Sequence, residues 1–240
     1  MSYIFFIATF AAYFIKGLSG FANTIVFTTI LSFFRDNKNI SPLEVMISYP
    51  SDAIMAFKNR KKINKKECTK LSVLIIIGSI PGIYFLKMGS PGIIKCILGA
   101  AICLIGVDLL IAMKRPSAKE NPVLLWVIGI VSGVLCGMFG IGAMLASYFG
   151  RTTKDTERFK ANINMMFLVD ATFRIIAYSL LEMITIKMLI NALMLIPCML
   201  AGLFLGIFLA GKISDSLAKK IIIVLLFITG GILFASNIRC

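Results

Sequence analysis

Long apolar stretches follow one another along almost the whole chain, with only short polar joints between them. A helix needs about 20 apolar residues to cross the hydrocarbon core of a bilayer, and 59% of this chain is hydrophobic, more than in soluble domains. We therefore expect an all-α polytopic membrane protein, embedded in the lipid bilayer of the cell membrane. The stretches are 2–34, 42–57, 71–87, 91–113, 122–150, 161–182, 188–210 and 217–236.

The net charge of +14 comes mostly from Lys and Arg residues in the joints between apolar stretches. Basic joints orient membrane helices, so this charge indicates membrane topology and we expect no nucleic-acid partner. The chain has no histidine, and none of its six cysteines forms a CxxC pair. We therefore expect no metal site and no cofactor.

Two of the apolar stretches, 2–34 and 122–150, are too long for one ordinary span and too short for two, and each has a glycine pair near its middle. Gly17 and Gly20 precede Gly137 and Gly140 by 120 residues, which is half the chain. Further matches lie in the same order at nearly the same offset, and they predict a duplication with repeats 1–118 and 119–240. The further matches are Asp52-Ala53 with Asp170-Ala171, Ile80-Pro81 with Ile196-Pro197, and Ser90 with Ser214.

The basic residues test how each half crosses the membrane. If each interrupted stretch crosses once, the two sides of the membrane receive 12 and 11 basic residues. If each stretch instead enters and leaves on the same side, the joints 58–70, 114–119, 151–160 and 212–220 lie together with 17 basic residues, and the opposite face keeps six. The positive-inside rule favours the second arrangement. Two full spans per stretch give the same sidedness, but each arm is short for a full crossing.

Each repeat is therefore predicted to contain a re-entrant or broken helical hairpin followed by three transmembrane helices. An odd number of crossings inverts the second repeat relative to the first and leaves both termini outside. Inverted repeats with broken helices are typical of secondary transporters, which bind substrate near the membrane midplane.

The glycine-containing tips of the two hairpins are the candidate binding site. Irregular backbone at membrane depth is tolerated where it is buried in protein or lines a cavity, and the helix N-terminus after each tip favours an anion. Close packing of helices through small residues is the alternative explanation. The candidate tip residues are Gly17, Ser19, Gly20, Asn23, Thr24, Cys136, Gly137, Gly140 and Gly142.

Charged residues inside the predicted spans are costly and therefore suggest function. Lys16 precedes the first tip, where we expect it to complement an anion. Asp170 and Arg174 are one helical turn apart, so an ion pair within one helix is one interpretation. The alternative is that Arg174 faces the cavity, while Asp52 and Asp170 take part in proton coupling.

Segments 17–22 and 133–142, and the basic joint 59–63 after Pro50-Ser51-Asp52, are similar to those of the TauE/SafE family of sulfite exporters. The resemblance covers essentially the whole chain, although 21–26 and 141–146 lack the triple glycine and the proline that members usually carry. It implies export of sulfite or of a small organosulfur or carboxylate anion, coupled to the membrane potential or to protons.

We therefore predict a secondary transporter, with a small anionic substrate bound between the hairpin tips. Thiol-assisted uptake of a sulfur species such as thiosulfate, with Cys136 at its centre, is one alternative, and a non-transporting membrane scaffold is another. The chain has no HExxH or GxSxG motif and no paired carboxylates at the tips, so we do not expect an enzyme. The sequence leaves open whether the protein forms a homodimer.

Overall fold

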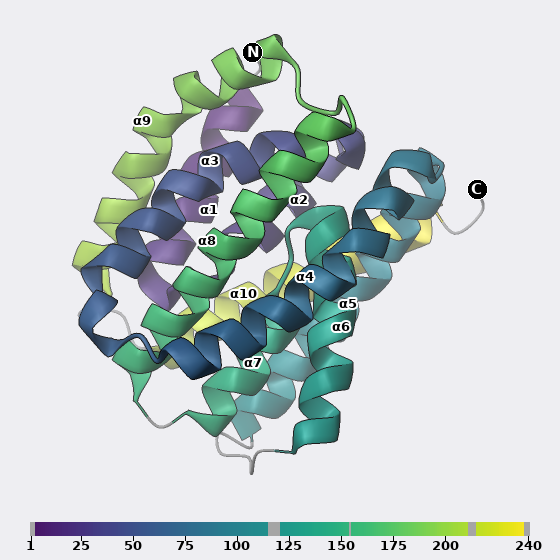
Figure 1. Cartoon of the computed structure of the whole chain (residues 1–240). Coiled ribbons are helices and arrows are strands. Elements are labelled where there is room, and N and C mark those ends of the chain that lie inside the picture. Colours follow the sequence, from purple (N-terminus) through teal and green to yellow (C-terminus); the bar gives the residue numbers. More distant parts are fainter. Residues whose placement is uncertain (1–2, 115–120, 154, 211–214, 238–240) are drawn as a thin grey trace.

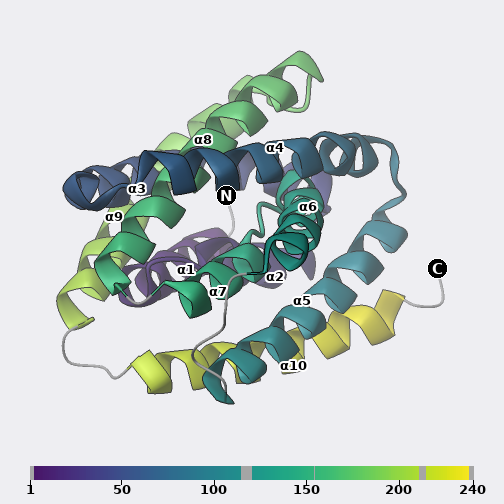
Figure 2. The ribbon, with the colours of Figure 1, turned by 60° about the horizontal axis from the view of Figure 1, so that its bottom comes forward.

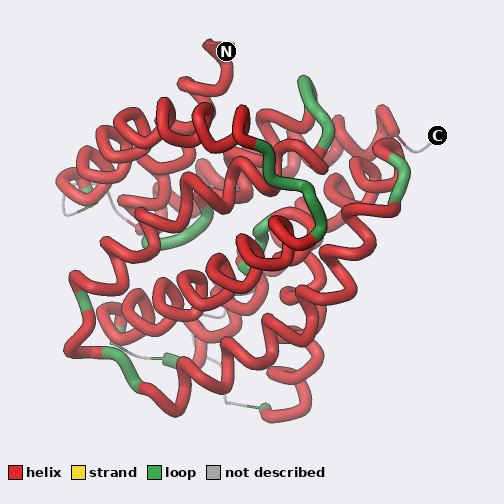
Figure 3. Tube along the Cα trace, turned by 45° about the horizontal axis from the view of Figure 1, so that its top comes forward, coloured by secondary structure: helices red, strands yellow, loops and turns green. Residues whose placement is uncertain are grey.

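The structure, a computed structural model, describes residues 3–114, 121–153, 155–210 and 215–237. These residues form helices and loops, without strands (Figures 1 and 3). Parts of the predicted joints 114–119 and 212–220, together with Cys240, lie outside the described residues. The first half contains α1 (Tyr3–Ser19), α2 (Asn23–Ser32), α3 (Asn37–Lys58), the short 3-10 helix η1 (Arg60–Lys62), α4 (Lys65–Met88) and α5 (Pro91–Lys114). The second half contains α6 (Pro122–Phe139), α7 (Ala143–Thr152), α8 (Thr156–Leu180), α9 (Ile186–Leu209) and α10 (Asp215–Asn237).

Within the described residues, five helices are long and apolar enough to cross a membrane: α4, α5, α6, α8 and α9. Their exposed side chains are largely apolar, as expected for a surface that faces lipid. This agrees with the predicted all-α polytopic membrane protein. The predicted span 161–182 lies in α8, but that helix ends at Leu180, and Glu182 has a positive φ of 58°.

Both interrupted stretches contain a break at the glycine pair. α1 ends at Ser19 and α2 begins at Asn23, while α6 ends at Phe139 and α7 begins at Ala143. The second arms, α2 and α7, have 10 residues each. A helix of that length extends about 15 Å, roughly half of a hydrocarbon core. These arms are therefore too short to cross a membrane.

Helices of the first half pack mainly against helices of the second half. The most extensive pairs are α4 with α6, α1 with α9, α5 with α10, and α3 with α8. Let each helix of the first half correspond to the helix five places later, so that α1 corresponds to α6 and α5 to α10. Under this correspondence, the pair of α4 with α6 becomes the pair of α9 with α1. The pair of α3 with α8 and the pair of α5 with α10 each map onto themselves. Figure 2 shows α5 and α10 side by side along one edge of the molecule. Each of these contacts between the halves therefore has a counterpart under this correspondence.

Glycines allow the helices of two of these pairs to approach closely. A Cβ atom at Gly17 of α1 would lie 2.7 Å from the Cα atom of Gly206 in α9. A Cβ atom at Gly78 of α4 would likewise lie 2.7 Å from the Cα atom of Gly133 in α6. Small residues permit such backbone contact between membrane helices. The pairs α1–α9 and α4–α6 therefore hold the first arm of each broken stretch against the other half.

Candidate functional site

The two breaks leave two helix N-termini that no described side chain caps. Gly20, Ala22 and Gly140 have left-handed φ values of 86°, 75° and 77° and turn the chain between the arms. The first backbone hydrogen bonds of the new helices run from Val26 N to Ala22 O (3.4 Å) and from Ala146 N to Gly142 O (3.0 Å). The amides of each first turn before these bonds have no acceptor within their helix.

Both uncapped N-termini line the same pocket. Its walls combine the first tip and first turn of α2, the second tip and start of α7, and side chains of α3 and α8. The charged members are Asp52 and Arg174. The lining residues are Phe21, Ala22, Asn23, Thr24, Ile25, Ser48, Asp52, Gly140, Ile141, Gly142, Ala143, Phe167 and Arg174.

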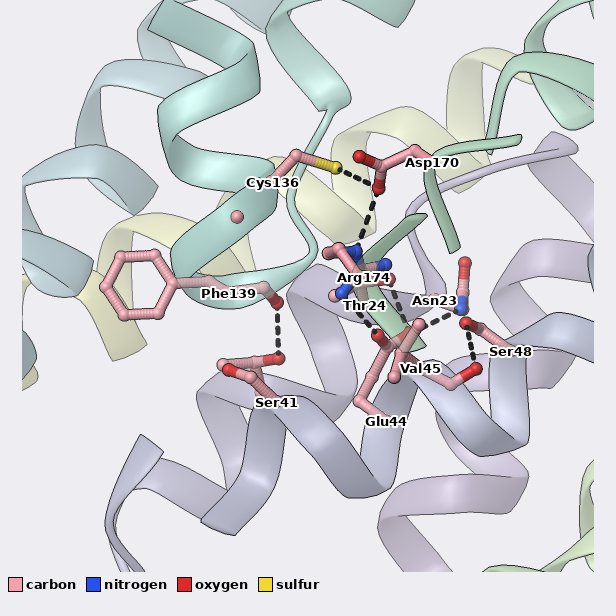
Figure 4. A network of polar contacts seen from close by, with 12 residues as sticks. Asn23, Thr24, Ser41, Glu44, Val45, Ser48, Cys136, Phe139, Asp170 and Arg174 are labelled. Carbon is pink, nitrogen blue, oxygen red and sulfur yellow. Dashed lines mark hydrogen bonds and ion pairs between the residues drawn. The ribbon is translucent and has the colours of Figure 1, made fainter. Parts of the chain in front are cut away.

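Arg174 presents one end of its guanidinium to this pocket. Its Nε donates to Asp170 Oδ2 at 2.8 Å, and the side chain is 4% exposed. Its Nη1 has no hydrogen-bond partner among the described residues and lies 3.7 Å from Glu44 Oε2. Figure 4 shows Arg174 between the two carboxylates. The ion pair within α8 is therefore present, and Arg174 also lines the cavity.

Gly140 is placed where a side chain would enter the site. Its φ is left-handed, and a Cβ atom built there would lie 2.8 Å from Glu44 Oε2 and from Thr24 Cγ2, and 2.9 Å from Arg174 Nη1. Both the backbone conformation and the space therefore favour glycine at this position.

Cys136 and Asp170 form the polar contact behind Arg174. Cys136 Sγ donates to Asp170 Oδ2 at 3.0 Å, and Ser79 Oγ donates to Asp170 Oδ1 at 2.9 Å. Cys136 is fully buried and is not among the residues that line the pocket. Its thiol therefore acts here as a hydrogen-bond donor that holds Asp170.

Lys16 occupies the corresponding position in the first half. Its Nζ lies 2.6 Å from Asp52 Oδ1 and donates to Ser51 Oγ at 2.8 Å. Lys16 precedes Cys136 by 120 residues, and Asp52 precedes Asp170 by 118, so the residue before each tip bonds to the matching aspartate. Lys16 itself is not among the pocket-lining residues, because its charge is directed at Asp52.

The remaining predicted tip residues hold the backbone of the tips. Ser19 Oγ lies 2.6 Å from Phe21 O and accepts from Phe21 N at 3.3 Å, and Gly20 O accepts from Asn164 Nδ2 of α8 at 3.1 Å. Gly137 O accepts from the hydroxyl of Tyr178 at 2.7 Å. A Cβ atom at Gly137 would meet the backbone of Ser79, and one at Gly17 would meet α9. Gly17 and Gly137 therefore allow close packing between helices.

Glu44 of α3 was missed by the sequence reasoning. It is fully buried, and its Oε1 accepts from Thr24 Oγ1 at 2.7 Å and from Asn23 Nδ2 at 3.2 Å. The signal was available, because Glu44 lies inside the predicted span 42–57 and a charge there is as costly as those of Asp170 and Arg174. The side chains of Asn23 and Thr24 are thus turned towards Glu44.

Comparison with known proteins gives one result. Neither a curated protein nor a solved structure matches the chain. The family model described as "Sulfite exporter TauE/SafE" matches residues 5–233. This match extends from α1 into α10 and includes both tips and all the residues of the pocket. The chain therefore belongs to the TauE/SafE family of sulfite exporters.

Proposed function

We propose that this protein is a secondary transporter that exports a small anion such as sulfite, or a small organosulfur or carboxylate anion, across the cell membrane. The observation that carries the proposal is the convergence on one pocket of two uncapped helix N-termini and of Arg174, whose Nη1 has no hydrogen-bond partner among the described residues. The substrate is expected to bind there.

The amides at the two helix N-termini and the guanidinium of Arg174 suit an anion with several oxygens. Each helix N-terminus acts as roughly half a positive charge and offers free amides. A guanidinium is planar and binds oxyanions through several N–H groups. Sulfite carries three oxygens in a pyramid, so it can accept from more than one of these donors. The buried surroundings strengthen each of these contacts.

An inverted relation between 1–118 and 119–240 is part of the proposal. The correspondence of helix pairs between the halves and the matching bonds of Lys16 and Cys136 support it. In transporters built this way, the two repeats rock around a central site so that it opens to one side at a time. With the basic joints inside, both termini lie outside.

Proton coupling through Asp52 and Asp170 stays a prediction. Each of them already has a cation in direct contact, Lys16 at 2.6 Å and Arg174 at 2.8 Å. Protonation of either aspartate would break a buried ion pair, which is costly. The role that these contacts support better is to hold α1 against α3 and to orient Arg174.

The test is transport by the purified protein in proteoliposomes under an imposed pH gradient. Sulfite, sulfoacetate, thiosulfate and simple carboxylates are offered in turn, and we expect uptake above protein-free liposomes for at least one. Arg174→Gln should lower that transport by about tenfold or more. Arg158→Gln, the same substitution nearer the start of α8, is the matched control. A folded Arg174→Gln protein that transports like the wild type would contradict the assigned site.

A further inference from the structure

Among the described buried charged residues, Glu44 is the one carboxylate without a hydrogen-bonded cation. Lys16 neutralises Asp52 at 2.6 Å, and Arg174 neutralises Asp170 at 2.8 Å. Glu44 Oε2 lies 3.7 Å from Arg174 Nη1, which is too long for a hydrogen bond. With all five residues ionised, these buried side chains carry a net charge of −1, and Glu44 is the surplus.

Glu44 lies directly behind the pocket wall: it is not itself a lining residue, but three residues that it contacts, Asn23, Thr24 and Arg174, line the pocket. Its Oε1 is held by Asn23 and Thr24, the first two residues of α2. Its Oε2 and the Nη1 of Arg174 face each other beside Gly140, and neither has a hydrogen-bond partner among the described residues. Leaving a buried donor and acceptor unmet is costly. The Nη1 of Arg174 therefore still has an N–H group to donate to a ligand oxygen.

An ionised Glu44 and a bound anion oppose each other. Like charges a few ångströms apart in a buried site repel strongly, and the two would compete for Arg174 Nη1. A protonated Glu44 removes the surplus charge, releases Nη1 to the anion and turns Oε2 into a hydroxyl donor. The same carboxyl group thus changes from a competitor into a ligand when it gains one proton.

We propose that Glu44 is the proton-binding residue of this transporter, taking up one proton with each anion and releasing it when the anion leaves. The inference rests on the proposed function of the pocket. One O–H bond forms at Glu44 on loading and breaks on unloading, and the proton comes from and returns to water. A divalent anion then crosses with one proton, so the cycle moves one net negative charge.

Charged groups near Glu44 affect how readily its carboxyl group ionises. The cations favour its ionised form, and the aspartates favour its protonated form. Because Lys16 and Arg174 are already matched by Asp52 and Asp170, protonation of Glu44 brings the buried net charge to zero. The titratable and charged groups near it are Tyr13 and Lys16 of α1, Asp52 of α3, Cys136 of α6 and Arg174 of α8, and Arg174 is in turn paired with Asp170.

The experiment compares two modes of transport in the same proteoliposomes, with radiolabelled sulfite as the probe. Exchange of internal for external sulfite at equal pH needs no net proton movement, whereas accumulation driven by a pH gradient does. Glu44→Gln imitates the protonated side chain. At a single fixed pH, we expect its exchange to remain clearly above that of protein-free liposomes. Its gradient-driven accumulation should fall by about tenfold or more.

Controls separate this inference from the function on which it rests. Protein-free liposomes account for sulfur dioxide that crosses the lipid, and the exposed carboxylate variant Glu157→Gln should behave like the wild type in both modes. A wild type that exchanges none of the anions would end both proposals. A wild type that exchanges sulfite, beside a Glu44→Gln protein that still accumulates it, would overturn the role of Glu44 alone.

Two further results would also count against Glu44. Loss of exchange in a folded Glu44→Gln protein would overturn the proposal, because the neutral side chain should still accept the anion. If Glu44→Gln does not fold, Glu44→Asp keeps an acid but moves it away from Arg174. The pH at which its exchange is half-maximal should then differ from the wild type, and an unchanged pH profile would overturn the assignment.

Discussion

Substitution of the two tip glycines separates backbone strain from occupation of the pocket. Gly20 and Gly140 both have left-handed backbones, so alanine at either should cost about 1–2 kcal/mol of folding free energy. At Gly20 the new methyl group would meet the flexible side chain of Lys160, with its nearest atom at 3.0 Å. At Gly140 it would lie within 2.9 Å of Glu44, Thr24 and Arg174.

Gly140→Ala should therefore cost more folding free energy than Gly20→Ala, and it should also weaken transport. Forcing a methyl group between close buried neighbours adds about 1–3 kcal/mol, so Gly140→Ala should be the less stable of the two in denaturant titrations in detergent. It also pushes on the Nη1 of Arg174, so we expect about tenfold weaker transport at low substrate concentration. Gly20→Ala should keep most of its transport.

Gly231→Ala of α10 is the control for a glycine with free space, because a Cβ atom there meets nothing within 4 Å. It should transport like the wild type and gain up to about 1 kcal/mol of stability, since alanine is the better helix former. Equal loss of transport in Gly20→Ala and Gly140→Ala, with equal loss of stability, would refute the reasoning. The effect would then come from backbone strain, and the pocket beside Gly140 would not be the binding site.

Three further substitutions test individual contacts. Lys16→Met should lower the free energy of unfolding by about 3–5 kcal/mol, because it leaves Asp52 charged and unpaired, and adding Asp52→Asn should restore much of the loss. Cys136→Ser keeps a donor to Asp170 and should transport normally. If uptake were thiol-assisted, the same variant would lose transport. Backbone amides at the start of α8 hold the pKa of Asp155 below its usual value. The ionised Asp155 therefore stabilises the fold at neutral pH, and this stabilisation is lost as the pH falls through the lowered pKa. The stability difference between wild type and Asp155→Ala, followed by thermal unfolding, should therefore vanish in acid.

The sequence carried enough information to locate the helix breaks and the costly charges. A glycine pair in the middle of an overlong apolar stretch marks a break, because irregular backbone at membrane depth needs special residues and a protein environment. The same rule selected Lys16, Asp52, Asp170 and Arg174, all of which are buried in the structure. Glu44 meets the rule equally well and was passed over, although no additional information was needed to find it.

Only the tertiary structure decided which tip glycines face the pocket and which face another helix. Gly140 and Gly142 line the pocket, while Gly17 and Gly137 lie against backbones of α9 and α4. In a soluble helix the polar face would show which side is exposed. In a membrane helix the sides that face lipid and protein are both apolar, so spacing along the chain cannot separate binding from packing.

The partners of the buried charges were likewise set by the fold. Lys16 was expected to complement an anion, but it is bonded to Asp52, 36 residues away, and Cys136 is bonded to Asp170, 34 residues away. The sequence alone determined that this chain forms apolar helices, that two of its long stretches break at glycine pairs, and that charges occur inside the apolar stretches. The packing of one half against the other decided which charges neutralise each other and left Glu44 in surplus, because an ion pair depends on distance in space.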